Sequence, residues 1–283
     1  MTTADADTLA CPACRGPLRF QGTLAREALG DGTLCCAACG AGWPVSAGLP
    51  RLVDESRLPR ADRVMRVLYD RLAPLHDPVT RVLFPILQGS TEAEARDGYM
   101  HRLDLGSLRA ADRTRPVRIL DVGIGGGASL PLLARDLPFP MDAEIWGVDL
   151  SERMLAQCRR RVERGGAHAV RLLVADAHAL PFPEASFDRV LHVGGIGGYG
   201  DPRRALAEMA RVARRGTPIV VVDEQLDPRF RRSAFHRLAF RALTFYTAHA
   251  ASPVDHLPAG ATDVVSEQLS RYYYCLTFHM PPV

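Results

Sequence analysis

The chain has 283 residues, a formal net charge of +3, 47% hydrophobic residues and 24% charged residues. These values are typical of a globular protein with one large core and room for a small appended domain. The small net charge does not indicate a nucleic-acid partner. No apolar run is long enough to indicate a membrane span. The acidic, polar N-terminus is unlike a secretory signal, so we expect a cytoplasmic protein. Every basic residue is Arg, and neither Lys nor Asn occurs, which excludes a Schiff-base lysine, a P-loop lysine and a catalytic asparagine.

Two Cys-x-x-Cys pairs lie near the N-terminus, Cys11 with Cys14 and Cys36 with Cys39. Each pair turns tightly enough for both thiolates to face one ion, and two pairs complete a tetrahedral site of four sulfur ligands. In a cytosolic chain this spacing favours Zn²⁺ over disulfides. Four thiolates leave no open coordination position, so we predict a structural ion in a domain too small for its own core. Cys35 is an alternative to Cys36, but the Cys-x-x-Cys register followed by glycine favours Cys36.

The residues around these cysteines resemble known zinc ribbons. The pattern Cys-Pro-x-Cys-x-Gly-x-Leu, then Cys-x-x-Cys-Gly, then Trp-Pro-Val-x-x-Gly-Leu-Pro-Arg-Leu-Val runs from Cys11 to Val53. It resembles the ribbons of rRNA guanine-N1 methyltransferases and of the small activator subunit of tRNA and protein methyltransferases, which implies a zinc ribbon over residues 1–54. From Met1 to Val53 four Arg and four acidic residues cancel, and four thiolates around Zn²⁺ leave an anionic site, so phosphate binding is disfavoured. We therefore expect the ribbon to pack on the main domain, with RNA binding as the less favoured alternative.

A polar linker begins near Asp54 and leads into a region that we expect to be helical, residues 55–115. Helices are predicted at Arg63–Leu72 and Thr91–Leu105, and proline residues break the segment between them.

Strands and helices alternate from Pro116 onward. We predict five strands, at Val117–Val122, Glu144–Val148, Ala169–Val174, Phe187–Val193 and Thr217–Asp223. Helices fall between them, including Glu152–Arg164 and Arg203–Arg214. This alternation predicts a doubly wound, mostly parallel α/β sheet covered on both faces. Asp263–Leu269 and Tyr272–Met280 are predicted to add an antiparallel hairpin, which gives seven strands.

An apolar strand runs directly into a glycine-rich turn between Ile119 and Gly127. Gly123, Gly125 and Gly127 let the backbone lie against a nucleoside-bearing cofactor. A second apolar run ends at Asp149, whose carboxylate is then placed to accept hydrogen bonds from two ribose hydroxyls.

Several ordered motifs now resemble the class I S-adenosylmethionine-dependent methyltransferases, over roughly Pro116 to Met280. Ile124 replaces the Cys of the commoner first motif and leaves its three glycines intact. The resemblance implies a Rossmann-like fold in which Asp121 accepts from the ammonium group of the methyl donor and Asp176 from the adenine amino group. It also implies three residues that flank the adenine ring: Leu150, Met154 and Ala177.

A glycine-rich turn followed by an acidic residue has an alternative interpretation, a nicotinamide-dependent dehydrogenase. The pattern here is G-x-G-G-G rather than G-x-G-x-x-G, and a dehydrogenase leaves the Asp176 motif and the terminal hairpin unexplained. Residues 191–195 also lack the Asn/Asp-Pro-Pro-Tyr box of enzymes that methylate adenine amino groups in nucleic acids.

Two further segments bear on the methyl acceptor. Residues 69–77 resemble the Tyr-Asp-x-x-Ala segment that closes over the cofactor in quinone-biosynthesis methyltransferases, which implies that Tyr69 and His76 are lid residues. An insert at residues 227–255 carries Phe235, Phe240 and Phe245 at near-helical spacing, which predicts either a core-packing stripe or an apolar lid over a hydrophobic substrate. We expect the arginines of this insert to face water.

Methyl transfer from a sulfonium is an in-line displacement that depends on positioning, and it needs a general base only if the acceptor must lose a proton. His192 and His236 are the candidate bases, with Asp223 and Glu224 as alternatives. We predict methyl transfer from S-adenosylmethionine to a small apolar metabolite, such as a quinone, polyketide or lipid precursor. The alternatives are an rRNA base methyltransferase and a cofactor-binding regulatory protein without turnover.

Overall fold

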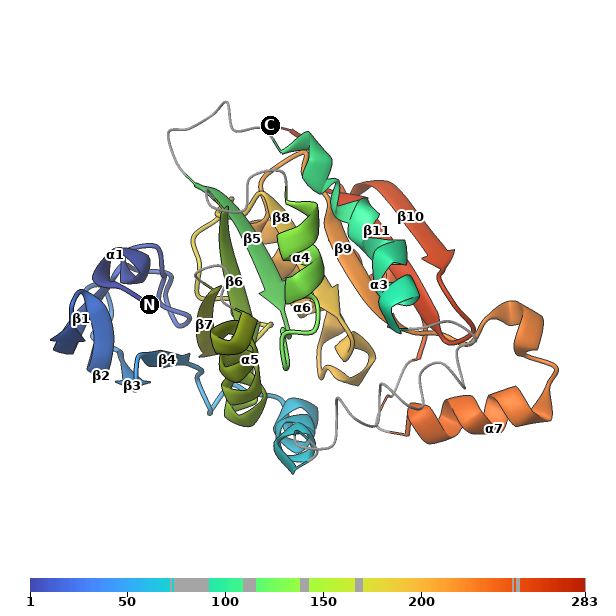
Figure 1. The fold of residues 1–283 in the computed structure, drawn as a ribbon, viewed down its shortest axis with the longest axis horizontal. Coiled ribbons are helices and arrows are strands. Elements are labelled where there is room, and N and C mark those ends of the chain that lie inside the picture. The colour runs from blue at the N-terminus through green and yellow to red at the C-terminus, as the bar shows by residue number, and fades with distance from the viewer. Residues whose placement is uncertain are drawn as a thin grey trace.

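The computed structural model describes residues 1–71, 73, 92–108, 116–137, 143–165, 170–245, 247 and 250–282. Within these residues one mixed sheet of eleven strands runs through the molecule, in the order β1-β2-β3-β4-β7-β6-β5-β8-β9-β11-β10 (Figure 1). The strands of its central part are β5 (Val117–Val122), β6 (Ala143–Asp149), β7 (Val170–Ala175), β8 (Arg189–Val193), β9 (Ile219–Glu224), β10 (Thr262–Gln268) and β11 (Tyr273–His279).

The central part confirms the predicted doubly wound fold. Strands β5 to β9 are parallel, and β11 and β10 add antiparallel to β9 as the predicted hairpin. The order reverses at β5, because β6 and β7 lie on one side of it and β8 and β9 on the other. A crevice therefore opens at the carboxyl ends of β5 and β8, where open α/β sheets bind their ligands.

Helices cover both faces of the central sheet. The helices are α3 (Glu92–Met100), α4 (Leu130–Asp136), α5 (Glu152–Gly165), α6 (Pro202–Val212) and α7 (Ala234–Leu243), and residues 60–71 are also helical. One apolar cluster joins α3, α4 and α5 to one face, and another joins α6 to the opposite face. The predicted helix Thr91–Leu105 ends early, at Met100, because two short 3₁₀ turns follow around Asp104, whose φ is +47°.

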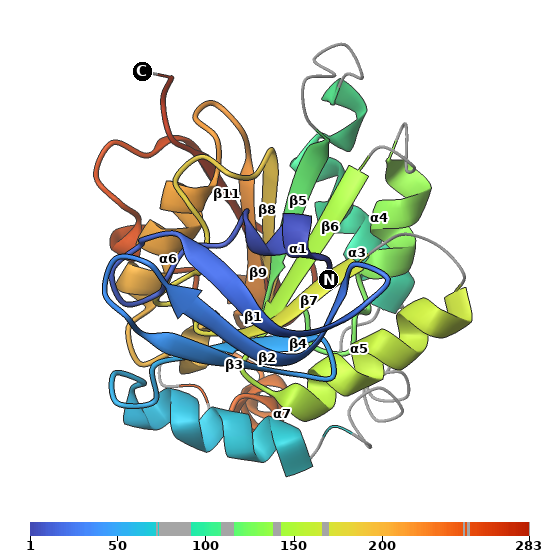
Figure 2. The same cartoon turned by 90° about the vertical axis from the view of Figure 1, so that its left-hand side faces the viewer.

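The N-terminal module, residues 1–54, contains α1 (Thr3–Ala6) and the antiparallel strands β1 (Leu18–Ala25), β2 (Ala28–Cys36), β3 (Gly42–Ser46) and β4 (Leu49–Leu52). Its strands stand in front of the central sheet in Figure 2. Strand β4 pairs in parallel with β7, through Arg51 with Val174 and Leu52 with Ala175. The predicted total of seven strands is therefore wrong, because this pairing joins the module to the central sheet.

Side-chain contacts also fasten the module to the main domain. Arg171 on β7 lies 2.6 Å from a carboxylate oxygen of Asp5, and Arg15 lies 2.9 Å from Glu208 on α6. Apolar residues of the module belong to the same buried cluster as α6. The module thus extends the core instead of forming a separate one. Among the described residues, no helix is both long enough and apolar enough to cross a membrane.

Candidate functional site

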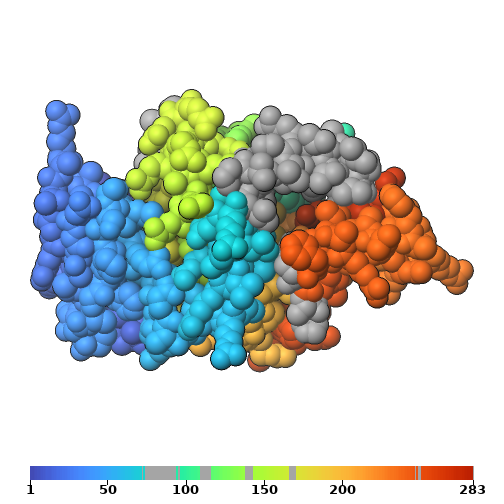
Figure 3. Space-filling view, turned by 90° about the horizontal axis from the view of Figure 1, so that it is seen from below, coloured from blue at the N-terminus to red at the C-terminus, as the bar shows by residue number. Residues whose placement is uncertain are grey.

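A cavity of about 430 Å³ lies at the carboxyl ends of the parallel strands. Figure 3 looks onto this end of the molecule, where the helical residues 60–71 and α7 lie. Nine of the ten predicted cofactor residues line the cavity: Tyr69, Asp121, Gly123, Gly125, Asp149, Leu150, Met154, Asp176 and Ala177. Residues from four separate segments therefore meet in one place.

The glycine turn after β5 is fixed against β6. The backbone N–H groups of Gly123 and Ile124 both donate to the carbonyl of Val148, at 2.8 and 3.0 Å. Gly123 has a φ of +71°, a conformation that other residues adopt only with strain. The N–H of Gly125 donates to a carboxylate oxygen of Asp149 at 2.9 Å, and the N–H of Ser151 donates to the other at 2.8 Å. These two donors set the orientation of the Asp149 carboxylate, whose remaining lone pairs can accept from a ligand.

Gly127, the tenth predicted cofactor residue, does not line the cavity. A Cβ atom at this position would lie 2.6 Å from Sγ of Cys158 and 2.8 Å from the side chain of Leu130. The glycine therefore allows α5 to pack closely against the turn. Its role is in helix packing, as for the third glycine of dinucleotide-binding turns.

Asp121 is a buried carboxyl group that lines the cavity. Burial raises its pKa to about 7, against the opposing effect of the nearby Arg96 guanidinium. Arg96 donates to the hydroxyl of Tyr99 at 3.0 Å and to that of Ser129 at 3.3 Å, and all four residues line the cavity. Arg96 was not predicted, because it lies on a helix outside the ordered motifs. The pair offers a carboxyl and a guanidinium side by side to a zwitterionic ligand.

A buried polar group supports the loop after β7. One carboxylate oxygen of Asp176 accepts from the N–H of His178 at 2.9 Å and lies 2.6 Å from its Nδ1. Although burial alone would lower the pKa of His178, Asp176 and Asp62 raise it overall. Asp62, from the helical residues 60–71, lies 4.0 Å from His178 and accepts from the N–H of Gly200 at 3.0 Å. This group links the predicted adenine side of the cavity to the helix that covers it.

The helical residues 60–71 include Tyr69, the first residue of the segment that was predicted to form a lid. Tyr69 lines the cavity, and Asp70 accepts from the hydroxyl of Ser151 at 2.5 Å. His76, the other predicted lid residue, lies outside the described residues.

The far end of the cavity is apolar and aromatic. It is lined by Val222, Phe240, Leu243, Phe245, Leu269, Tyr272 and Tyr273, together with the carboxylate of Glu224. The rings of Phe240 and Tyr272 pack with centroids 5.6 Å apart. The expected single stripe of Phe235, Phe240 and Phe245 is wrong, because only Phe240 is buried and Phe235 is 67% exposed. A step of five residues turns about 140° around a helix, so it cannot follow one face.

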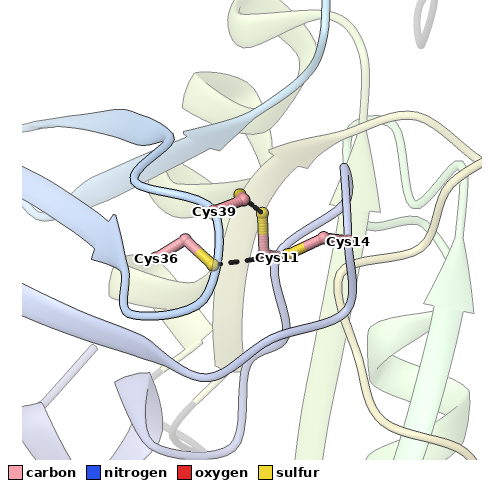
Figure 4. Close-up of side chains that lie close together, drawn as sticks. All are labelled: Cys11, Cys14, Cys36 and Cys39. Carbon is pink, nitrogen blue, oxygen red and sulfur yellow. Dashed lines mark hydrogen bonds between the residues drawn. The ribbon is translucent and has the colours of Figure 1, made fainter.

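Four cysteines of the N-terminal module come together as predicted (Figure 4). The sulfur atoms of Cys11, Cys14, Cys36 and Cys39 all lie within 4.8 Å of one another, with Cys11–Cys39 at 3.8 Å and Cys14–Cys36 at 3.5 Å. Ligands about 2.3 Å from a tetrahedral Zn²⁺ would be about 3.8 Å apart. The cluster thus fits a tetrahedral metal ion and contains Cys36 instead of the alternative Cys35.

The methyltransferase domain family matches residues 119–216 of the chain. The demethylmenaquinone methyltransferase of Thermus thermophilus is 34% identical over 179 residues, which cover 63% of this chain and 74% of that protein. The chain belongs to the S-adenosylmethionine-dependent methyltransferase family. The phosphatidylethanolamine N-methyltransferase of Cereibacter sphaeroides is 38% identical over 107 residues, or 38% of this chain and half of the length of that relative.

Solved structures share the fold of this methyltransferase. A methyltransferase from Methanococcus maripaludis superposes with a TM-score of 0.53 at 14% identity, covering 76% of this chain and 94% of that one. The cyclase SpnF superposes with a TM-score of 0.58 at 18% identity, covering 80% of this chain and 98% of that one. Because a cyclase also has this fold, the fold alone does not define the reaction.

The two histidines predicted as bases lie outside the residues that line the cavity of this methyltransferase. His192 is fully buried beneath Gly123, and its Nδ1 donates to the carbonyl of Val122 at 2.7 Å. Burial lowers the pKa of His192, so the ring is neutral. His236 on α7 has its Nδ1 2.7 Å from the hydroxyl of Tyr272, which does line the cavity. Each histidine thus contacts a residue that lines the cavity, but His192 does so through the backbone carbonyl of Val122 and His236 through the hydroxyl of Tyr272.

Proposed function

We propose that this protein transfers a methyl group from S-adenosylmethionine to a small apolar acceptor. The observation that carries the proposal is the division of one cavity into a polar end and an aromatic end. The polar end holds the carboxylates that suit the donor, and the aromatic end is lined mainly by apolar and aromatic side chains together with Glu224. A cavity of about 430 Å³ has the size of typical small-molecule sites, and it is lined mainly by apolar groups at the acceptor end.

Three groups would hold the donor. Asp149 would accept from both ribose hydroxyls, since backbone donors already orient its carboxylate. Asp121 would accept from the ammonium group, and Arg96 would pair with the carboxylate of the same methionyl moiety. Asp176 and Ala177 would lie beside the adenine ring. The donor supplies an electrophilic methyl group, and the chain supplies its orientation.

The acceptor would be a quinone-like or lipid-like molecule. The aromatic end offers Phe240, Tyr272 and Tyr273 to a flat or flexible apolar group. The relatives are named for methylation of demethylmenaquinone and of phosphatidylethanolamine, and both of these acceptors are apolar over most of their length. An RNA base has less support, because residues 1–53 of the module that would bind RNA carry four Arg and four acidic residues and so have no net positive charge.

Glu224 is the group that we propose to accept a proton when the acceptor must lose one. It ends β9 at the aromatic end of the cavity, whereas both carboxylate oxygens of Asp223 accept from the backbone N–H groups of Gly195 and Gly197. The hydroxyl of Tyr272, backed by His236, would hold the acceptor in place. Asp223 thus shapes the glycine-rich loop, and Glu224 lines the cavity where the acceptor would lie.

We also propose that the four cysteines bind Zn²⁺ in a structural role. The distances between the sulfur atoms support a closed tetrahedral site. A matching test is metal analysis of the purified protein, for which the proposal expects one zinc per chain, released when the thiols are modified.

The proposed reaction is tested with methyl-labelled donor and a panel of acceptors. The panel contains a reduced naphthoquinone, phosphatidylethanolamine and ribosomal RNA. We expect label in one of the two apolar acceptors. Label in RNA alone would contradict the proposal, and binding of the donor without transfer to any acceptor would favour the regulatory alternative.

A further inference from the structure

The outer face of α7 carries an apolar stripe that the fold leaves exposed. Phe235 and Leu238 are 67% and 71% exposed. With Ala242 they occupy positions i, i+3 and i+7, which lie along one line of a helix. The inner face of the same helix packs on Tyr272 through His236 and Phe240. The stripe is therefore not needed to hold the helix in place.

The segment around this stripe is strongly basic. Residues 228–245 contain five Arg and no acidic residue. Asp227 pairs with Arg229 at 2.6 Å, and four further arginines are exposed: Arg231, Arg232, Arg237 and Arg241. Arg237 and Arg241 lie one turn apart beside the stripe. A helix with exposed Phe and Leu beside Arg has the composition of helices that lie in the interface of a bilayer, where Arg reaches the lipid headgroups.

The stripe lies beside the aromatic end of the cavity. Phe240 and Leu243, from the opposite side of the same helix, line the cavity, and so does Phe245, which is 70% exposed. The helix projects from the body of the molecule (Figures 1 and 3), at the same end as the helical residues 60–71. Val64 and Val67 on that helical segment are 66% and 46% exposed. Exposed apolar side chains of two helices thus lie at the same end of the molecule as the cavity.

We propose that α7 docks the protein on an anionic lipid bilayer, with Phe235 and Leu238 inserted among the lipids and the arginines at the headgroups. The charge favours this occupant over a second copy of the chain, because two such basic faces repel each other. Docking itself does not depend on the reaction. Its consequence, that an apolar acceptor enters the aromatic end directly from the bilayer, rests on the proposed function.

Sedimentation with vesicles tests this inference without donor or acceptor. The vesicles are phosphatidylcholine alone or phosphatidylcholine mixed with anionic phosphatidylglycerol. We expect binding to the mixed vesicles that weakens with added salt. The double variant Phe235→Ser with Leu238→Ser should bind on the order of 100-fold more weakly, and Arg237→Gln with Arg241→Gln about 30-fold more weakly. Matched controls are Leu24→Ser, which removes another exposed apolar side chain, and Arg160→Gln, and both should bind as the unchanged protein does.

Three results would overturn the docking proposal. The first is the absence of binding to anionic vesicles, and the second is binding by the Phe235→Ser, Leu238→Ser double variant as tight as that of the unchanged protein. The third is a dimer, seen by sedimentation velocity, that the same substitutions dissociate, since α7 would then be a contact between copies. Donor affinity, measured by calorimetry on every variant, separates this proposal from the proposed function: it should stay unchanged even when vesicle binding is lost.

Discussion

Replacing Asp149 with Ala should abolish tight donor binding while leaving the fold intact. In the structure, the N–H groups of Gly125 and Ser151 hold this carboxylate at the end of β6, at 2.9 and 2.8 Å. A ribose diol would add two hydrogen bonds to a charged acceptor, each contributing about 1.5–3 kcal/mol. Because Asp149 is only partly buried, we take the lower part of that range, which gives about 3–4 kcal/mol or roughly a 200- to 1,000-fold rise in Kd.

The assay is isothermal titration calorimetry with S-adenosylhomocysteine, the demethylated product, which avoids turnover. Asp149→Asn is the matched control, because it keeps the size of the side chain and one acceptor oxygen but loses the charge. Its Kd should lie between that of the unchanged protein and that of Asp149→Ala. Circular dichroism and the thermal midpoint Tm report on the fold. A Kd for Asp149→Ala within about fivefold of the unchanged protein would correspond to less than about 1 kcal/mol and would refute the ribose contact.

Three further predictions concern the rest of the site. Burial raises the pKa of Asp121 to about 7, so the carboxyl is protonated below that pH and cannot pair with the donor ammonium. The Kd for the donor should therefore rise about tenfold per pH unit below 7. Asp121→Asn should weaken donor binding at pH 8 and remove most of this pH dependence. Glu224→Gln should lower kcat by about 100-fold or more for an acceptor that loses a proton, with an unchanged donor Kd; an unaffected kcat would remove Glu224 from the chemistry. Cys36→Ser should release the metal and lower Tm, whereas Cys35→Ser, which alters a cysteine outside the cluster, should do neither; equal effects of the two would contradict the assigned ligands.

Much of the fold could be predicted because its signals are local. An apolar strand followed by a glycine turn specifies its own geometry, and the strand ends of a parallel sheet meet at one edge, so Asp121, Asp149 and Asp176 could be expected to lie together. The four cysteines were equally predictable, since each Cys-x-x-Cys pair forms its turn from adjacent residues. The structure places both groups as the sequence patterns indicated.

Features that depend on distant pairing were not predictable. Strand β4 is only four residues long, and nothing in Leu49–Leu52 indicates that it pairs with β7. Arg96 approaches Asp121 only because α3 packs on that face of the sheet. Asp223 and Glu224 are adjacent in the sequence, yet one binds the backbone of the glycine-rich loop and the other lines the cavity, because successive side chains of a strand point to opposite sides.

The central claim is that one cavity holds the donor at its polar end with the reacting methyl group directed toward the aromatic end. A crystal structure with S-adenosylhomocysteine bound tests it most directly. The account predicts the ribose hydroxyls within hydrogen-bond distance of Asp149 and the sulfur atom facing the end lined by Phe240, Tyr273 and Glu224. A ligand bound elsewhere, or with its sulfur directed away from those residues, would contradict it.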